Sequence, residues 1–442
     1  MTKPNIILVV FDDITIEQLQ RMPQLMKLAN TGVSFSNCIS VTPLCQPARM
    51  TLLSGQMSHN HHAYDNTGVP LSSFDHPTLI PKQVQVAGYK TCHIGKYTNS
   101  GLVTEPIPAG WDDWHAISPQ KYFGYSINDN GVTTVKGSTI NDYYTTVCRD
   151  RALAFIASTT QPFFMQLCFK APHFDQPSAD WLDTTPSPEY AGVVGAKQAP
   201  RNPNFNVNMG TPPAYMAHAD MDSAKIARVD NFYSRSTEVL ISADNALRSI
   251  LAALAAAGKT NTVIIATADH GYMRGEGKDP AGKNVPYLPS MRVPCTISGP
   301  VEFVAQNKTC TELVNQADIA ATIVALSGAT PLRTLDGASL TGLMLNPLAG
   351  ALRNYLLLEW LPPVEATGGA TGWFVPIPVY RGLMSKRYLY VIYSTGEEEL
   401  YDLVDDPHQL QNIVALNRGV ASSMAAITAQ SANCVGAACM LM

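Results

Sequence analysis

The segment Leu44-Cys45-Gln46-Pro47-Ala48-Arg49 places a thiol and a guanidinium group four residues apart. Proline is favoured in the first turn of a helix, so we expect a helix from Pro47 to Ser54. Cys45 would then lie just before the positive end of the helix dipole, where a developing anion is stabilised. Arg49 would lie one turn further on and face back toward Cys45. A small buried cysteine before a helix explains this motif equally well, so other residues must decide.

Polar side chains also follow four of the apolar runs that predict buried β-strands. The runs and their polar neighbours are Asn5 to Phe11 before Asp12 and Asp13, Tyr89 to Ile94 before Gly95 and Lys96, Pro162 to Phe169 before His173, and Thr262 to Ala268 before Asp269 and His270. Strands that alternate with helices predict a mostly parallel sheet, and parallel strands share one carboxyl edge, where ligands bind. We therefore expect these side chains to converge with Cys45.

The elements that would position these residues predict an α/β fold. We expect a large, mostly parallel sheet flanked by helices over residues 1–345 and a smaller C-terminal antiparallel sheet plus helix over residues 346–442. The second part is predicted from short consecutive strands at Tyr355 to Glu359, Val379 to Met384, Tyr388 to Tyr393 and Glu399 to Leu403. Residues 111–141 are expected to form a loop. Residues 176–213 are expected to form a long excursion that shapes a substrate pocket.

Composition excludes several classes of protein. The 442 residues are 46% hydrophobic and 15% charged, which is typical of a well-buried globular enzyme. A net charge of −5 predicts no nucleic-acid partner. No apolar run approaches the roughly 20 residues of a membrane span, so we expect no membrane association.

The sequence does not decide the cellular compartment of the protein. A strand follows Met1 almost at once, which leaves no room for a signal peptide in the sequence itself. The protein would be cytoplasmic, or secreted, periplasmic or lysosomal if a leader was removed. Nine cysteines do not form a disulfide framework, although Cys434 and Cys439 could pair in the tail.

A histidine cluster at His59, His61 and His62, followed by Asn66, raises the question of zinc. No cysteine or carboxylate stands at matching spacing. The wall of a polar pocket is the favoured interpretation, and a solvated loop is nearly as well supported.

The motifs together resemble the sulfatase family, the formylglycine-dependent branch of the alkaline phosphatase superfamily. The resemblance is collinear over nearly the whole chain. It rests on Asn5 to Asp13, Cys45-Gln46-Pro47-Ala48-Arg49, Gly95-Lys96, Pro172-His173, Asp269-His270-Gly271, Lys283 nine residues before Arg292, and Glu399-Leu400-Tyr401-Asp402-Leu403 with Asp406-Pro407 and Asn412. Within the family the chain is most similar to N-acetylglucosamine-6-sulfatases, through Thr42-Pro43-Leu44-Cys45, His59-Asn60-His61-His62, Gly95-Lys96-Tyr97 and Ala199 to Asn206.

The resemblance implies a sulfatase that hydrolyses sulfate esters, with a sulfated sugar as the expected substrate. It implies that a formylglycine-generating enzyme oxidises Cys45 to formylglycine, whose hydrate is the nucleophile. It also implies a divalent cation held by Asp12, Asp13, residue 45, Asp269 and His270. Oxygen ligands favour Ca²⁺, with Mg²⁺ or Mn²⁺ as alternatives.

The remaining roles are implied in the same way. Arg49 would hold the hydrated formylglycine, and Lys96 and Lys283 would bind sulfate oxygens. Asp13 would also act as base toward the nucleophile. His173 would be the general acid for the leaving alcohol.

The chain departs from the family pattern at three positions, of which Thr98 points to the glucosamine-type subfamily and His270 keeps an alternative open. Thr98 replaces a histidine found in many sulfatases, His270 stands where many have asparagine, and Leu288 replaces a glutamate. Asp-His is also seen in relatives that hydrolyse phosphonate or phosphate esters. The alternative is therefore a phosphonate or phosphate ester hydrolase on the same scaffold. A third hypothesis is a binding protein whose Cys45 stays a thiol.

Overall fold

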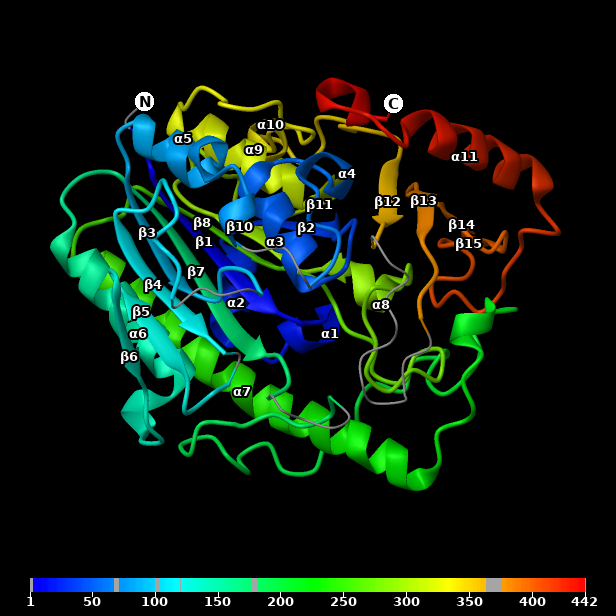
Figure 1. Cartoon of the computed structure of the whole chain (residues 1–442), viewed down its shortest axis with the longest axis horizontal. Coiled ribbons are helices and arrows are strands. Elements are labelled where there is room, and N and C mark those ends of the chain that lie inside the picture. The colour runs from blue at the N-terminus through cyan, green and yellow to red at the C-terminus, as the bar shows by residue number, and fades with distance from the viewer. Residues whose placement is uncertain are drawn as a thin grey trace.

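The computed structural model describes residues 3–66, 71–99, 104–119, 121–175, 181–362 and 376–441. Figure 1 shows a large twisted sheet with helices on both of its faces and a smaller C-terminal sheet beside it. This architecture confirms the predicted fold class. The expected domain boundary between residues 345 and 346 stays a prediction. Residues 176–180, where the predicted excursion begins, lie outside the described residues.

The centre of the large sheet is parallel. Strand β1 (Asn5–Asp12) lies between β7 (Phe163–Pro172) and β8 (Thr262–Ala268) and pairs with both in parallel. Strand β3 (Lys90–Gly95) continues the parallel arrangement on the far side of β7. All four strands therefore end at the same edge of the sheet, as the polar residues after them predicted.

The outer strands are mixed in direction. Beyond β8, β10 (Cys295–Ser298) runs antiparallel and is followed by β2 (Gly32–Ile39), which pairs with β11 (Lys308–Asn315) in parallel and with the short β9 (Arg292–Val293). On the other side, β4 (Asp113–Ser118) pairs with β3 in parallel, and β5 (Ser126–Asp129) and β6 (Val132–Val135) complete an antiparallel edge.

The expectation of a loop over residues 111–141 was wrong, because β4, β5 and β6 lie within it. The reason is physical. Strands β5 and β6 carry few apolar residues, and every residue of β6 is exposed. Backbone pairing with β4 holds this edge, and such pairing leaves no apolar run in the sequence.

Two groups of helices cover the sheet. One face carries α2 (Pro23–Asn30), α6 (Tyr144–Ser158) and α7 (Ser223–Ala256), and the other carries α3 (Cys45–Ser54), α5 (Ile80–Val86) and α9 (Gln316–Ser327). The short helices are α1 (Ile16–Leu19), α4 (Ser58–His61), α8 (Leu288–Met291) and α10 (Thr341–Leu345).

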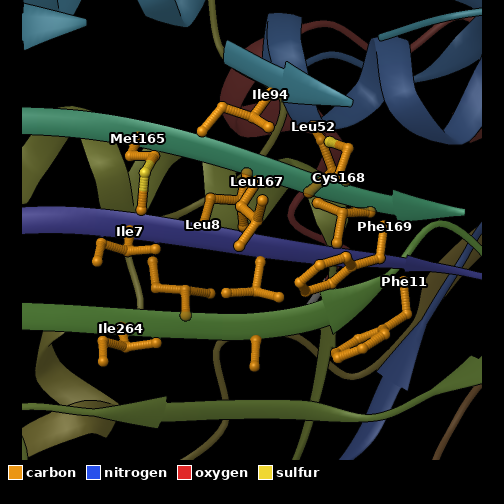
Figure 2. Close-up of a cluster of buried hydrophobic side chains, with 14 of the residues drawn as sticks. Ile7, Leu8, Phe11, Leu52, Ile94, Met165, Leu167, Cys168, Phe169 and Ile264 are labelled. Atoms are coloured by element: carbon orange, nitrogen blue, oxygen red, sulfur yellow. The ribbon is translucent and has the colours of Figure 1, made fainter. Parts of the chain in front are cut away.

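Apolar side chains from the central strands form the main core. Figure 2 shows Ile7, Leu8, Met165, Leu167 and Ile264 from adjacent strands packed against one another. Each of these residues is at most 6% exposed. Burying one such side chain contributes roughly 1.5–3 kcal/mol to folding, which makes these strands a rigid base for the residues at their ends.

The C-terminal sheet is antiparallel, in the order β12 (Leu356–Trp360), β13 (Tyr380–Met384), β14 (Tyr388–Tyr393) and β15 (Glu398–Asp402). Helix α11 (Arg418–Ser431) packs against β13 and β14. Cys434 and Cys439 form a disulfide just after this helix. The predicted second sheet, its final helix and the pairing of these cysteines are confirmed.

Within the described residues, α7 is the one helix whose length and composition would allow it to cross a membrane. This corrects the expectation that no apolar stretch approaches such a length. Half of its apolar window is buried, and the helix packs against β7, α2 and α6. A core helix of a globular protein has the same properties, so they are weak evidence for a membrane span.

Candidate active site

The register of the parallel strands brings the predicted residues together. Asp12 lies opposite Pro172 of β7, the residue before His173, and Phe11 lies opposite Ala268 of β8, the residue before Asp269. All the candidate side chains in this region are buried, and each is at most 6% exposed: Asp12, Asp13, Cys45, Arg49, Lys96, His173, Asp269, His270 and Lys283. The carboxyl edge of the sheet therefore carries the site that the sequence predicted.

Gly95 explains how Lys96 enters this site. Its backbone has a φ of +100°, in the left-handed region that favours glycine. A Cβ atom at this position would lie 2.0 Å from the carbonyl oxygen of Cys168 on β7. Any other residue would therefore push β3 away from β7 and displace Lys96.

Helix α3 presents Cys45 as its first residue, with Leu44 as the N-cap. The helix begins two residues before the predicted Pro47, which still falls within the first turn, where its missing N–H costs nothing. The side chain of Asn66 accepts a hydrogen bond of 2.9 Å from the backbone N–H of Gln46. Cys45 thus lies at the positive end of the helix dipole.

Arg49, one turn along α3, ties this helix to the sheet. Its guanidinium donates to Asp269 Oδ2 over 3.0 Å and to the carbonyl oxygen of Lys96 over 2.6 Å, and it lies 3.6 Å from Asp12 Oδ2. Arg49 therefore connects three strand ends. Its closest contacts are to these carboxylates and to a backbone carbonyl, and not to the Cys45 sulfur.

The Cys45 sulfur is surrounded by cationic groups. Lys283 Nζ lies 3.4 Å and His270 Nε2 lies 3.3 Å from Cys45 Sγ. Burial would raise the pKa of this thiol, but Lys283 and Lys96 hold it well below its ordinary value. The pocket around residue 45 therefore stabilises an anion.

Asp12 and Asp13 are balanced by these same cations. Lys96 Nζ donates to Asp12 Oδ2 over 2.6 Å, and Lys283 Nζ donates to Asp13 Oδ1 over 3.1 Å. Burial would raise the pKa of Asp12, but Lys96, His173 and Arg49 bring it well below its ordinary value. Asp12 is therefore ionised and available as a ligand over the whole physiological pH range.

The chemistry of the donors fits a divalent cation. Asp12, Asp13, Cys45 and His270 each direct one ligand atom into a region less than 4.8 Å across. Asp269 is engaged differently, because Arg49 binds its Oδ2 and the backbone N–H groups of Asp13 and His270 bind its Oδ1. The buried oxygens of Asp12 and Asp13 are the hard ligands that Ca²⁺ and Mg²⁺ prefer.

His173 is oriented with the help of Lys170, a buried cation that sequence reasoning missed. His173 Nδ1 donates to the carbonyl oxygen of Phe174 over 2.7 Å, so Nε2 faces Asp13 at 3.7 Å. Lys170 Nζ donates to the carbonyl oxygens of His173 and Phe174. The signal in the sequence was a lysine in a mostly apolar run, and the structure buries Lys170 fully in β7.

Aromatic side chains next to His173 were also missed. The Phe174 ring stacks on His173 with centroids 4.0 Å apart and on Trp181 at 5.3 Å. Such isolated aromatic residues carry no pattern that would mark them in the sequence.

The histidine cluster makes structural contacts. His59 Nδ1 lies 2.8 Å from Glu359 Oε2, and His61 Nε2 lies 3.1 Å from Thr51 Oγ1. Burial lowers the pKa of His61 to about 3, so this ring is neutral. The two rings join α4 to the C-terminal sheet and to α3.

Comparison with known proteins defines the class. The sequence profile of the sulfatases matches residues 4–329, and the profile of the C-terminal region of N-sulphoglucosamine sulphohydrolase matches residues 281–431. The chain belongs to the sulfatase family and is a sulfuric ester hydrolase.

Two relatives sharpen this result. The N-acetylglucosamine-6-sulfatase of Homo sapiens is 30% identical over 385 residues, covering 81% of this chain and 67% of the relative. An extracellular sulfatase SULF-1 homolog of Drosophila melanogaster is 32% identical over 371 residues, covering 78% of this chain and 31% of the relative. The chain also spans 49% of the length of a related protein of Caenorhabditis elegans.

Solved structures show the same fold. A protein in complex with its substrate D-glucosamine-2-N,6-O-disulfate superposes with a TM-score of 0.80 at 20% identity, covering 97% of both chains. The phosphonate monoester hydrolase of Agrobacterium radiobacter superposes with a TM-score of 0.74 at 19% identity, covering 97% of this chain and 96% of that one.

Proposed function

We propose that this sulfatase removes sulfate from a sulfated sugar and that Cys45 is converted to formylglycine by a formylglycine-generating enzyme. The observation that carries this proposal is the position of Cys45 at the start of α3, with Lys283 beside its sulfur and with Lys96 and Arg49 on the neighbouring Asp12. This cationic pocket would accept the anionic sulfate group of the ester. A hydrated formylglycine would supply one hydroxyl to attack sulfur and a second whose deprotonation re-forms the aldehyde and releases sulfate.

The metal proposal rests on the buried carboxylates. Asp12, Asp13 and the oxygen of residue 45 would hold a divalent cation, most simply Ca²⁺, with His270 and Asp269 completing or supporting its shell. The cation would polarise a sulfate oxygen and stabilise the nucleophile as an anion. Asp269 would keep Arg49 in place and so hold the start of α3 against the sheet.

Protein groups would handle charge and protons. Lys283 and Lys96 would bind sulfate oxygens, since both ammonium groups are buried within reach of the carboxylates and Lys283 also of the Cys45 sulfur. His173 would give a proton from Nε2 to the leaving alcohol, because its Nδ1 is already occupied by a backbone carbonyl. Asp13, 3.7 Å from that nitrogen, would stabilise the protonated ring.

The sugar substrate is supported by the relatives named for N-acetylglucosamine-6-sulfate and by the neighbour bound to a sulfated glucosamine. We propose a location outside the cytosol for two reasons. One relative is named an extracellular sulfatase, and disulfides such as Cys434–Cys439 persist in oxidising compartments.

The phosphonate or phosphate ester hydrolase is the second candidate, because the Agrobacterium enzyme has the same fold. The test is kcat/KM on a matched pair, an aryl sulfate and an aryl phosphonate monoester with the same leaving group. We expect the sulfate to be preferred. A large preference for the phosphonate would overturn the proposal.

Mass analysis of the peptide that contains Cys45 tests the modification. After coexpression with the maturing enzyme, conversion of the CH2–SH side chain to an aldehyde replaces sulfur by oxygen and removes two hydrogens, which lowers the peptide mass. An intact thiol that can be alkylated would instead favour the hypothesis of a binding protein.

A further inference from the structure

A second group of metal-ligand side chains lies on the large sheet, on strands β3 and β4. Cys92 on β3 lies beside Asp113 on β4 in the parallel register, and His115 follows Asp113 on the same face two residues later. Their ligand atoms lie within 4.8 Å of one another. Of the other such groups in the described part of the chain, one is the active site and one has both of its cysteines in a disulfide.

The distances match a tetrahedral zinc ion. Cys92 Sγ lies 3.9 Å from Asp113 Oδ2, and His115 Nε2 lies 3.1 Å from Asp113 Oδ1. Ordinary Zn–S, Zn–N and Zn–O bonds at tetrahedral angles require separations of about 3.5 Å between sulfur and oxygen and about 3.4 Å between nitrogen and oxygen. Asp113 would bind the ion through Oδ2, the oxygen that faces Cys92, and His115 Nε2 would exchange its present contact with Oδ1 for a bond to the ion.

Neighbouring residues orient the ligands as in known metal sites. His115 Nδ1 lies 2.7 Å from Asp129 Oδ1 on β5, which leaves Nε2 directed at the cluster. Arg151 holds Asp129 in turn, with contacts of 3.0 Å and 2.6 Å. Asn130 donates to Asp113 Oδ1 over 2.7 Å, so the other oxygen can face a metal.

The cluster borders solvent on one side. Cys92 is fully buried, whereas the Asp113 side chain is 22% exposed. We propose that Cys92, Asp113 and His115 bind one zinc ion, with water as the fourth ligand. Binding replaces the thiol proton of Cys92, which passes to solvent, by a Zn–S bond, and no redox change occurs. The ion would join β3 to β4 and, through Asp129, to β5.

The experiment uses Co²⁺ as a probe in the full-length Cys45→Ser protein, stripped with a chelator. This background has no thiol in the active site, so a thiolate-to-cobalt charge-transfer band reports on the second group. We expect one such band per chain, displaced by Zn²⁺. Cys92→Ser and His115→Gln should each remove the band or weaken Zn²⁺ binding by roughly 100-fold or more. The matched control Cys148→Ser, another buried free cysteine, should keep it.

A network of ion pairs alone would give a different result. His115 lies between Asp113 and Asp129, so without a metal its loss would lower Tm equally with and without Zn²⁺. The carboxylates of the active site remain in both proteins and can bind Zn²⁺ in each, so the comparison is of the two Tm shifts. We expect Zn²⁺ to raise the Tm of the background protein more than that of His115→Gln. If Cys92→Ser does not fold, Asp129→Asn should still lower Zn²⁺ affinity by about 10-fold or more. A missing band in the background protein, or a band that survives Cys92→Ser, would overturn the proposal.

Discussion

Two carboxylates of equal burial stand in opposite electrostatic surroundings. Asp12 in the active site is 0% exposed and Glu399 in the C-terminal sheet is 1% exposed. Lys96, His173 and Arg49 offset the burial of Asp12 and lower its pKa well below the ordinary value. Glu399 is instead held by neutral groups. It accepts hydrogen bonds from Tyr287, Tyr393 and Tyr401.

The consequence is a difference in charge. Burial raises the pKa of Glu399 to about 7, although the tyrosine hydroxyls partly offset this. The comparison teaches that hydrogen bonds to neutral hydroxyls orient a buried carboxylate but do not keep it charged. The proposed metal binding needs a charged carboxylate, and the cations beside Asp12 keep it charged. Glu399 joins β14 and β15 to the loop that carries Tyr287, four residues after Lys283.

The largest effect is expected when residue 45 is removed from the cationic pocket. Cys45→Ala should lower kcat by roughly 10⁴-fold or more, because both the thiol and any nucleophile made from it are lost. The measurement is turnover of an aryl sulfate. Cys38→Ala, at another fully buried cysteine, is the control and should keep activity. Turnover by Cys45→Ala close to that of the unchanged protein would refute the role of residue 45.

Removing one cation from Asp12 tests the electrostatic half of the comparison. Lys96→Met should lower kcat/KM on an aryl sulfate by about 10²-fold or more, because the negative charges of the sulfate group and of Asp12 both lose the Lys96 ammonium group. Lys90→Met, on the same strand but half-buried away from the site, should change it little. An equal loss of kcat/KM in the two variants would show that the substitutions act by disturbing β3 and not by removing the charge of Lys96.

Glu399→Gln tests the other half through stability. The pKa of Glu399 is about 7 in the folded state and about 4.5 when unfolded, so the folded state holds the proton more tightly between these values. The free energy of unfolding therefore falls as pH rises through this window, by up to roughly 3 kcal/mol. Glutamine stays neutral and lacks this decline.

The stability of Glu399→Gln relative to the unchanged protein should therefore increase from pH 5 to pH 8 in urea denaturation. Glu398→Gln alters a carboxylate that is paired with Arg418 near the surface, and its difference should stay flat. A flat difference for Glu399→Gln as well would mean that Glu399 is ionised throughout.

The smallest effect is expected from a single hydroxyl. Tyr393→Phe removes the hydrogen bond of 2.5 Å to Glu399 Oε2 and should lower the free energy of unfolding by about 1 kcal/mol. The loss should grow with pH, since the ionised carboxylate depends more on its donors. A loss of stability that does not depend on pH would show that the Tyr393 hydroxyl does not stabilise the ionised form of Glu399.

Much of the site could be predicted from sequence because its residues lie at fixed local positions. Asp12, Lys96, His173 and Asp269 each follow an apolar run, and parallel strands share one edge. Strands β5 and β6 could not be predicted, because backbone pairing and not an apolar pattern holds them. Lys170 and Phe174 were missed because their contacts come from the turn after β7.

The sequence by itself determined the order of the central strands and the helices between them, the polar residues at the strand ends and the Cys45 motif, since all three depend on neighbouring residues. Only the tertiary structure decided which groups touch. It placed Arg49 on Asp269, Lys283 on Asp13, and Cys92 beside Asp113 and His115. The physical reason is that charge and coordination depend on distance in space, and the distances between distant segments are set by how the strands pair.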